Sequence, residues 1–353
     1  MFRTLTNQHG AAFIKLAQKY NPANPARIVS FSSQRPLPSK HANLRPPPPS
    51  VPPYFLFALG IPTAGGLYAY YKYLDEVPLT GRQRWIATSP AWERSLGDQE
   101  YKSLLRQYKN QILPKDHRAS VTVHRVGKRI HKAAIEFSKQ HNLEGNLEAS
   151  SQPTFTVIRS DMANAFVLPN NHIFVMTGLF KFARTEDELA AVLGHEMAHN
   201  ISRHIGEKVS GGLVVRLLAN LSLLIDPSGV LFSIFIPTVG LLRELPHSRI
   251  QEGEADRIGM HLAAIACYDP QAAQRVFLRM KQAESSGAGR QPPEFLSTHP
   301  SHDSRVTHME DWLPETRKLY GREGGLTCEH IRQEMQDART LAAQRQGQRE
   351  KSL

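Results

Sequence analysis

The stretch LGHEMAHN, residues 193–200, contains two histidines four positions apart, with a glutamate directly after the first. On a helix, His195 and His199 project from the same face, so both imidazoles can bind one metal ion. Glu196 then lies beside them, where a carboxylate can act on a bound water. A pattern of three fixed positions arises by chance in on the order of one chain of this length in a hundred, so it suggests a metal site without proving one.

The residues upstream predict that this motif lies inside a helix rather than in a loop. Thr185 and Glu188 have the spacing of a capping box, which marks the first turn of a helix. Helical periodicity continues from there to about residue 208.

A metal centre of this kind needs a third protein ligand. The metzincin spacing does not supply one, because Ser202 stands at the glycine of that motif and Ile205 at its histidine. On a later predicted helix, Glu252 and Asp256 are four residues apart and share a face. Glu252 can complete a His2Glu site, and Asp256 can accept the second N–H of a metal-bound histidine. Glu254 points about 200° around the same helix and is expected to be exposed.

The remaining histidines of this region are interpreted as surface or core residues rather than ligands. They are His204, His247, His261, His302 and His308.

The charge of the chain is concentrated near its N-terminus. The 353 residues carry 43 Lys and Arg against 32 Asp and Glu, a formal net charge of +11. Eight of the basic residues precede the first acidic residue, Asp75, and the remaining 279 residues hold 35 basic and 32 acidic side chains. A basic surface for polyanions is therefore not expected, and nucleic acid is not a predicted partner.

Residues 1–45 have the composition of a mitochondrial transit peptide. They are rich in Ser and Arg, contain no acidic residue and lack the uninterrupted apolar centre of a secretory signal. A disordered basic tail is the alternative. The proline-rich residues 46–53 predict a stiff, extended linker.

Residues 54–74 form an apolar run in which Lys72 is the one charge. At about 1.5 Å per residue, a helix of this length spans the hydrocarbon core of about 30 Å. Because basic residues precede the run and Asp75 and Glu76 follow it, the positive-inside rule keeps the N-terminus in the matrix. The rest of the chain is then exported to the intermembrane space. A buried core helix is the alternative.

Residues 75–320 are expected to form one domain, followed by a helical tail at 321–353. Helical periodicity predominates, and three short runs rich in branched and aromatic residues predict a small sheet. The predicted fold class is α+β and predominantly helical, preceded by one transmembrane helix. The expected helices cover 90–145, 185–208, 249–267 and 270–284, and the expected strands cover 154–158, 165–168 and 172–177.

An apolar segment at 213–242 contains two prolines, Pro227 and Pro237, and only two charges, Arg216 and Asp226. Each apolar half is predicted to be too short to span a bilayer. A pair of amphipathic or membrane-dipping helices and plain core packing both fit the sequence.

The two cysteines, Cys267 and Cys328, allow at most one bridge. This number excludes a disulfide-rich scaffold and a cysteine-built zinc ribbon. A structural or redox-responsive disulfide and two free thiols are equally compatible with the sequence.

Several blocks of the sequence occur together in one known family. They are Arg125 to Ile130, Asn164 to Pro169, Ile173 to Gly178, the helix of His195, the helix of Glu252, and Thr298-His299-Pro300 with Arg305. In these blocks, between about residues 121 and 306, the chain resembles the gluzincin metallopeptidases, which include bacterial HtpX and the CAAX prenyl protease. It is most similar to the mitochondrial inner-membrane members. The family usually has a glycine pair where this chain has Asn170 and Asn171, and asparagine also tolerates positive φ.

The resemblance implies a zincin-type metallopeptidase domain that binds one zinc ion per chain. It assigns His195, His199 and Glu252 as the zinc ligands and Glu196 as the general base.

The resemblance also implies that His299 stabilises the developing oxyanion. Arg305 either assists there or pairs with a carboxylate. The strand with Asn164, Ala165 and Phe166 is expected to align an extended substrate as an added strand.

The expected function is therefore that of a zinc-dependent metalloendopeptidase in the mitochondrial inner membrane, with its catalytic domain facing the intermembrane space. The expected partners are membrane-associated protein substrates and the lipid bilayer, and a homo-oligomer is compatible with the sequence. The resemblance implies stress-responsive protein quality control, including processing of the dynamin-like fusion GTPase.

Two alternatives remain at this level. A prenyl-protein protease would require several strong membrane spans, and one is predicted. A catalytically inactive, membrane-tethered scaffold would have no need to keep Glu196 beside two metal ligands.

Overall fold

The computed structural model describes residues 53–143, 147, 152–233, 248–285, 294–299, 303–321, 328, 330–333, 336–337 and 340. The chain divides into two units, Met1–Ala58 and Leu59–Leu353, and only the beginning of one helix is described in the first unit. The predicted leader, almost all of the linker and most of the C-terminal tail lie outside the described residues. The boundaries of these segments stay predictions.

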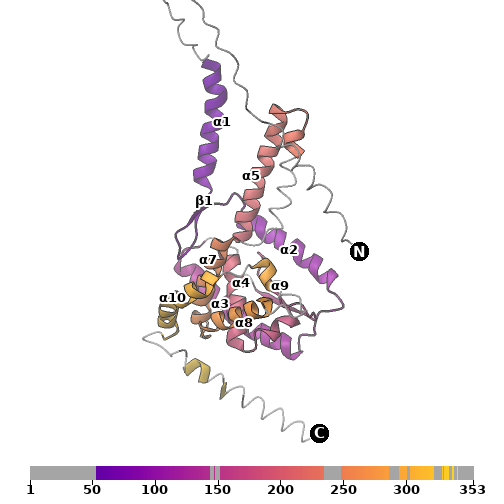
Figure 1. Cartoon of the computed structure of the whole chain (residues 1–353), viewed down its shortest axis with the longest axis vertical. Coiled ribbons are helices and arrows are strands. Elements are labelled where there is room, and N and C mark those ends of the chain that lie inside the picture. The colour runs from indigo at the N-terminus through magenta and orange to yellow at the C-terminus, as the bar shows by residue number, and fades with distance from the viewer. Residues whose placement is uncertain are drawn as a thin grey trace, which may run out of the picture. The chain divides into compact units, whose positions relative to one another are not determined.

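The described chain is mostly helical, with two small sheets (Figure 1). The helices are α1 (Pro53–Lys72), α2 (Pro90–Gln107), α3 (Arg118–Gln140), α4 (Glu186–Ile201), α5 (His204–Ile225), α7 (Arg249–Ile265), α8 (Ala272–Ser285), α9 (Glu294–Thr298) and α10 (Asp303–Tyr320). The strands are β1 (Leu74–Glu76), β2 (Gln83–Trp85), β3 (Thr154–Ile158), β4 (Ala165–Val167) and β5 (His172–Met176), and a 3-10 helix, η1, covers Thr177–Lys181. The predicted helical region 90–145 is thus two helices, because the chain turns between α2 and α3.

The larger sheet has the strand order β3-β5-β4, with β3 parallel and β4 antiparallel to β5. The predicted hairpin between β4 and β5 is present, and Asn171 in its turn has a φ of 64°. Its side-chain oxygen accepts a hydrogen bond of 2.8 Å from Asn200 on α4. The asparagine therefore provides the left-handed turn and also ties the sheet to the helix that carries the motif.

The two helices that carry the candidate ligands, α4 and α7, pack closely against each other. A Cβ atom placed on Gly194 would lie 2.9 Å from the carbonyl oxygen of Gly259, and one placed on Gly259 would lie 2.8 Å from the backbone nitrogen of His195. The absence of side chains at both positions lets the helix backbones touch. Nearly every residue of α4 is buried, so the motif lies in the core of the domain.

The segment between α1 and α2, for which the sequence predicted no structure, forms an antiparallel hairpin of β1 and β2. Arg84 of β2 donates to the backbone carbonyl of Ser202, at the end of α4. The backbone nitrogen of Ala87 donates to the Ser210 hydroxyl on α5 at 2.9 Å. The hairpin is therefore attached to the chain directly after the motif.

Helix α5 starts at His204, well before the apolar segment predicted from residue 213. The helix has 22 residues. Among the described residues, it is the one helix that is long and apolar enough to cross a membrane, judged by length and composition alone. The apolar half before Pro227 is therefore the later part of a longer helix that could cross a membrane as a whole, while the half itself stays too short to span. The membrane role predicted for α1 stays a prediction.

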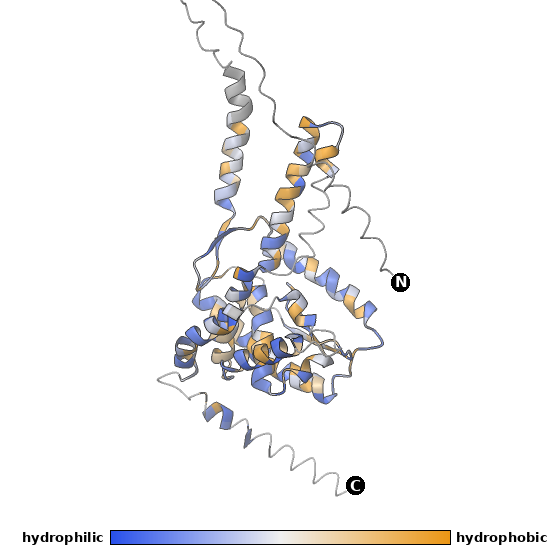
Figure 2. Ribbon diagram, viewed as in Figure 1, coloured by the Kyte–Doolittle hydropathy of each residue, from blue (hydrophilic) through white to orange (hydrophobic). Residues whose placement is uncertain are grey.

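The two ends of α5 have different surroundings. Near its start, His204, Gly206 and Ser210 are buried against the domain. Further along, the leucines are exposed, and Leu224 and Ile225 retain 80% and 82% of their accessible surface. In Figure 2 much of the ribbon along this part of α5 has the orange of hydrophobic residues. The exposed part, from about residue 211, is roughly 22 Å long at about 1.5 Å per residue, which is shorter than the bilayer core.

Candidate metal centre

Four buried side chains converge where α4, α7 and the end of α9 meet. His195 Nε2 lies 3.1 Å from His199 Nε2 and 3.2 Å from His299 Nδ1. The carboxylate oxygens of Glu252 lie 3.6 Å from His195 Nε2 and 3.5 Å from His199 Nε2. One ligand atom from each of the four residues lies within 4.8 Å of all the others. This spacing suits a single metal ion, and the structure thus brings the three predicted ligands together.

Asp256 orients the first histidine of the motif. His195 Nδ1 lies 2.9 Å from Asp256 Oδ1, and Arg305 donates to both oxygens of Asp256 at 2.7 and 2.8 Å. Burial acts to raise the pKa of the Asp256 carboxyl, but Arg305 and His195 outweigh burial and lower this pKa to about 2. An ionised carboxylate can only accept, so the proton of a neutral His195 stays on Nδ1 and its Nε2 lone pair faces the cluster.

Arg305 is buried and holds two carboxylates at once. Besides Asp256, its Nη1 lies 3.0 Å from Glu252 Oε2. Of the two roles that the sequence left open, the structure thus shows the pairing with carboxylates.

The chemistry of the donor set fits a zinc ion. The Nε2 atoms of His195 and His199 face each other beside the Glu252 carboxylate. Lone pairs that converge in this way repel each other unless a cation lies between them. Imidazole nitrogens with one carboxylate oxygen form a common ligand set of catalytic zinc.

His299 lies inside the cluster rather than beside it. Its Nδ1 is 3.0 Å from Glu252 Oε1, and its Nε2 is 3.2 Å from Glu196 Oε1. Burial acts to lower the pKa of the His299 imidazole, but the carboxylates of Glu196 and Glu252 outweigh burial and raise this pKa to about 10. The two predicted catalytic residues are thus in contact. His299 also offers a nitrogen to the metal position, which the sequence did not predict.

The predicted substrate strand is β4, an edge strand of the larger sheet. Asn164 accepts from the backbone of Met176, and Leu168 donates to that of His172. Bonding alternates along an antiparallel pair, so the backbone groups of Ala165 and Val167 point away from β5. The outer edge therefore presents Ala165 and Val167, where the sequence had indicated Asn164, Ala165 and Phe166.

One residue was misjudged from the sequence, whereas a second, His204, is a core residue outside the four-residue cluster, as interpreted. Glu254, expected to be exposed, is 2% exposed. It does point away from Glu252, but the β1–β2 hairpin and α5 cover that face, and Arg82 and His204 bind its carboxylate. His204 is fully buried, and its Nδ1 lies 2.7 Å from Nδ1 of His199. The one feature of the sequence that could have indicated this contact is the position of His204, five residues after His199.

The remaining candidates lie apart from the cluster or outside the described residues. Cys267 and Cys328 form a disulfide bond. His261 contacts Glu315, and the ring of His308 packs on that of Trp312. His247 and His302 lie outside the described residues.

Comparison with known proteins agrees with this geometry. The model of peptidase family M48 matches residues 124–313, a stretch that contains every residue of the cluster. A Schizosaccharomyces pombe protein named mitochondrial metalloendopeptidase OMA1 is 38% identical over 264 residues, which cover 74% of this chain and 73% of the relative. The Saccharomyces cerevisiae protein of the same name is 33% identical over 255 residues, 71% of this chain and 72% of the relative.

A human relative named metalloendopeptidase OMA1, mitochondrial, is 32% identical over 276 residues, 74% of this chain but 50% of the relative. The family match covers more than half of the chain, and the two fungal relatives match along most of their own length. The chain therefore belongs to peptidase family M48, and its activity is that of a metalloendopeptidase.

Proposed function

We propose that this chain hydrolyses peptide bonds at a centre of one zinc ion bound by His195, His199 and Glu252. One observation carries the proposal. Both histidines of the motif direct Nε2 at the same point as the Glu252 carboxylate, while their Nδ1 atoms are engaged on the outer side. Such a site is built to leave imidazole lone pairs for a metal.

A zinc ion in this site supplies a Lewis acid and lowers the pKa of water toward about 7. Glu196, next to the ligands on α4, takes the proton of the attacking water and returns it to the leaving amine. His299 Nε2 faces Glu196, so His299 is placed to donate a hydrogen bond to the oxyanion. With the metal held by His195, His199 and Glu252, His299 would act as this hydrogen-bond donor and not as a fourth ligand.

The substrate class follows from the edge strand. An extended segment of a protein can pair with the backbone groups of Ala165 and Val167 on β4, as a strand added to a sheet. Because these contacts use backbone atoms, they select for extended, unfolded segments more than for particular side chains. Membrane-associated proteins, among them the dynamin-like fusion GTPase, are the substrates that we propose, in a role in protein quality control.

The direct test is proteolysis of an unfolded protein before and after removal of the metal. We expect the purified chain to contain one zinc ion, to lose its activity on chelation and to regain it on adding zinc. The measurements are metal analysis and the rate of peptide release. Proteolysis that continues at the same rate after the metal is gone contradicts the proposal.

We further propose that the protein lies in the mitochondrial inner membrane, with α1 as its anchor and its catalytic domain in the intermembrane space. The mitochondrial names of the relatives and the exposed leucines of α5 support this location. Because the exposed part of α5 is too short to cross, we infer that it dips into one leaflet. Added protease should degrade the domain in mitoplasts but not in intact mitochondria. Protection in both preparations contradicts this orientation.

The two alternative functions are less well supported. A prenyl-protein protease encloses its site with several membrane helices, whereas one described helix meets the criteria for a span. An inactive scaffold would not require a buried Glu196 in contact with His299.

A further inference from the structure

The two histidine ligands are held in different ways on their outer sides. His195 Nδ1 contacts the carboxylate of Asp256, an arrangement common among metal-binding histidines. His199 Nδ1 instead faces the Nδ1 of another histidine, His204, at 2.7 Å. Nε2 of His204 then lies 3.1 Å from Glu254 Oε2. This series of contacts therefore ends at the carboxylate of Glu254. Asp256 contacts His195 directly, whereas Glu254 contacts His199 only through His204.

The hydrogen bonds that run from His199 through His204 to Glu254 have one consistent direction. Glu254 is a carboxylate paired with Arg82, so it accepts, and His204 must carry its proton on Nε2. The Nδ1 atom of a neutral His204 is then an acceptor, and His199 must donate to it from its own Nδ1. This tautomer of His199 leaves the Nε2 lone pair directed at the cluster. The opposite direction would place a lone pair of His204 against the carboxylate of Glu254.

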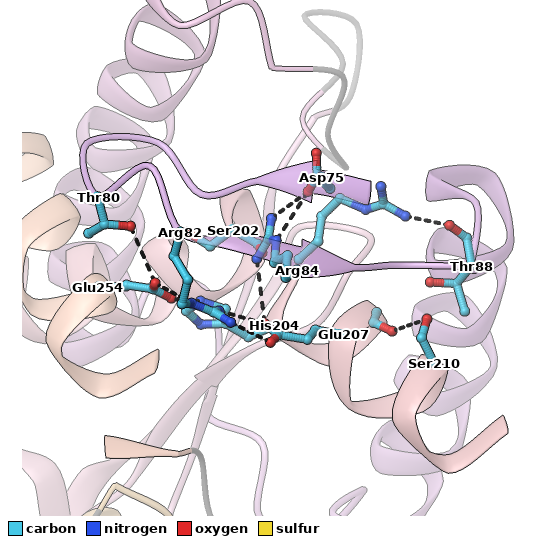
Figure 3. A network of polar contacts seen from close by, with 12 residues as sticks. Asp75, Thr80, Arg82, Arg84, Thr88, Ser202, His204, Glu207, Ser210 and Glu254 are labelled. Carbon is cyan, nitrogen blue, oxygen red and sulfur yellow. Dashed lines mark hydrogen bonds and ion pairs between the residues drawn. The ribbon is translucent and has the colours of Figure 1, made fainter. Parts of the chain in front are cut away.

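Glu254, the last residue in this series of contacts, is held in place by the β1–β2 hairpin (Figure 3). Arg82 donates to Glu254 from Nε at 2.7 Å and from Nη2 at 3.1 Å. Its Nη1 and Nη2 also lie 2.7 and 2.8 Å from the two oxygens of Glu207, on α5. Thr80 adds a bond to Glu254 at 3.3 Å. The carboxylate that holds His204 is thus held by several donors.

We propose that His204 is a positioning residue that fixes the tautomer and the ring orientation of the metal ligand His199, with Glu254 and Arg82 as its outer support. The proposal rests on the proposed metal centre. It assigns the three residues a part in metal binding although none of them touches the metal. His204 accepts a hydrogen bond from His199 and donates one to Glu254. The carboxylate of Glu254 therefore orients His199 through His204, and its negative charge does not lie next to His199.

The proposal is tested by zinc affinity in two variants of the full-length chain. His204→Phe keeps the volume of the ring but removes the acceptor. His204→Asn keeps an acceptor near the position of Nδ1 but cannot reach Glu254. We expect the Phe variant to bind zinc about 10–100-fold more weakly, as is typical when the partner of a metal-bound histidine is lost. The Asn variant should recover part of this loss. Competition with a chromophoric chelator measures the affinities, and the cobalt-substituted proteins should show a shifted visible absorption band.

His131 provides a matched control. It is a buried histidine on α3 and is not part of the metal cluster. His131→Phe makes the same chemical change in the core and should leave zinc affinity within about twofold of the wild type.

Each outcome bears on a different statement. Zinc affinity of the Phe variant equal to that of the wild type overturns the positioning role, as do equal losses in the Phe and Asn variants. If the Phe variant does not fold, Arg82→Met on the hairpin replaces it, and unchanged zinc affinity there overturns the proposal. Failure of the wild type to bind zinc contradicts the metal centre itself.

Discussion

Replacing Glu196 with glutamine is expected to lower kcat by about 10²–10⁴-fold while zinc content and KM stay close to those of the wild type. This is the range that a positioned general base contributes, and it corresponds to about 2.7–5.4 kcal/mol in the activation free energy. Glutamine has the size of glutamate and keeps an oxygen for the contact with His299 Nε2, which measures 3.2 Å in the structure. It cannot accept the proton of water. Metal analysis and steady-state proteolysis provide the two measurements.

Glu188 offers a matched control on the same helix. It is 2% exposed, belongs to the capping box of α4 and pairs with Arg279. Glu188→Gln replaces an equally buried carboxylate by its amide, and glutamine is also found at this position of capping boxes. We expect a loss of thermal stability with little change in kcat. A Glu196→Gln enzyme as fast as the wild type would exclude Glu196 as the general base.

The innermost part of the candidate site could be predicted from the sequence because its information is local. His195, Glu196 and His199 lie within one helical turn, and Glu252 and Asp256 repeat the same spacing on α7. Helical geometry alone states which of these side chains share a face. The capping box found at Thr185 and Glu188 is present in the structure, as is the predicted hairpin before β5.

The outer part could not be predicted because its contacts join distant segments. Arg82 and Glu254 are 172 residues apart in the chain, and His204 and Glu254 are 50 apart. The prediction that Glu254 points away from Glu252 on α7 was correct. A helical wheel does not show, however, what covers the face of the helix that carries Glu254. That face is covered by a hairpin whose strands have only three residues each, too few to produce a periodic signal.

Helix α5 shows a similar limit of sequence patterns. Its first residues include His204, Glu207 and Lys208, so a hydropathy scan places the start of the apolar segment later than the start of the helix. These polar residues are helical because they pack on the domain, where Glu207 pairs with Arg82. The sequence had placed them at the end of a helix expected over 185–208, whereas the structure ends that helix at Ile201 and begins α5 at His204, directly after Arg203 with its φ of 50°.

Replacing Glu252 with glutamine is expected to weaken zinc binding by about 1,000-fold or more, beyond the range of about 10–100-fold for residues that only orient a ligand. Glu252 is fully buried, and its oxygens lie 3.5 and 3.6 Å from the Nε2 atoms of His199 and His195. The amide removes the one negative charge in the ligand set and leaves Arg305 nearby. At saturating zinc, a 1,000-fold weaker affinity removes about 4 kcal/mol from the free energy of unfolding. Thermal unfolding with and without zinc measures this loss.

The same substitution at Glu254 separates a ligand from an orienting residue. Both glutamates are on α7, both are buried and both pair with an arginine, so Glu252→Gln and Glu254→Gln make matched changes in charge and volume. Only Glu252 faces the Nε2 atoms of the two histidines, whereas Glu254 reaches the cluster through His204. Zinc affinity should therefore fall much further in Glu252→Gln than in Glu254→Gln. The stabilisation gained on adding zinc should likewise be smaller in Glu252→Gln than in Glu254→Gln. Equal losses would contradict the assignment of Glu252 as a ligand, because of these two glutamates only Glu252 is proposed to bind the metal directly.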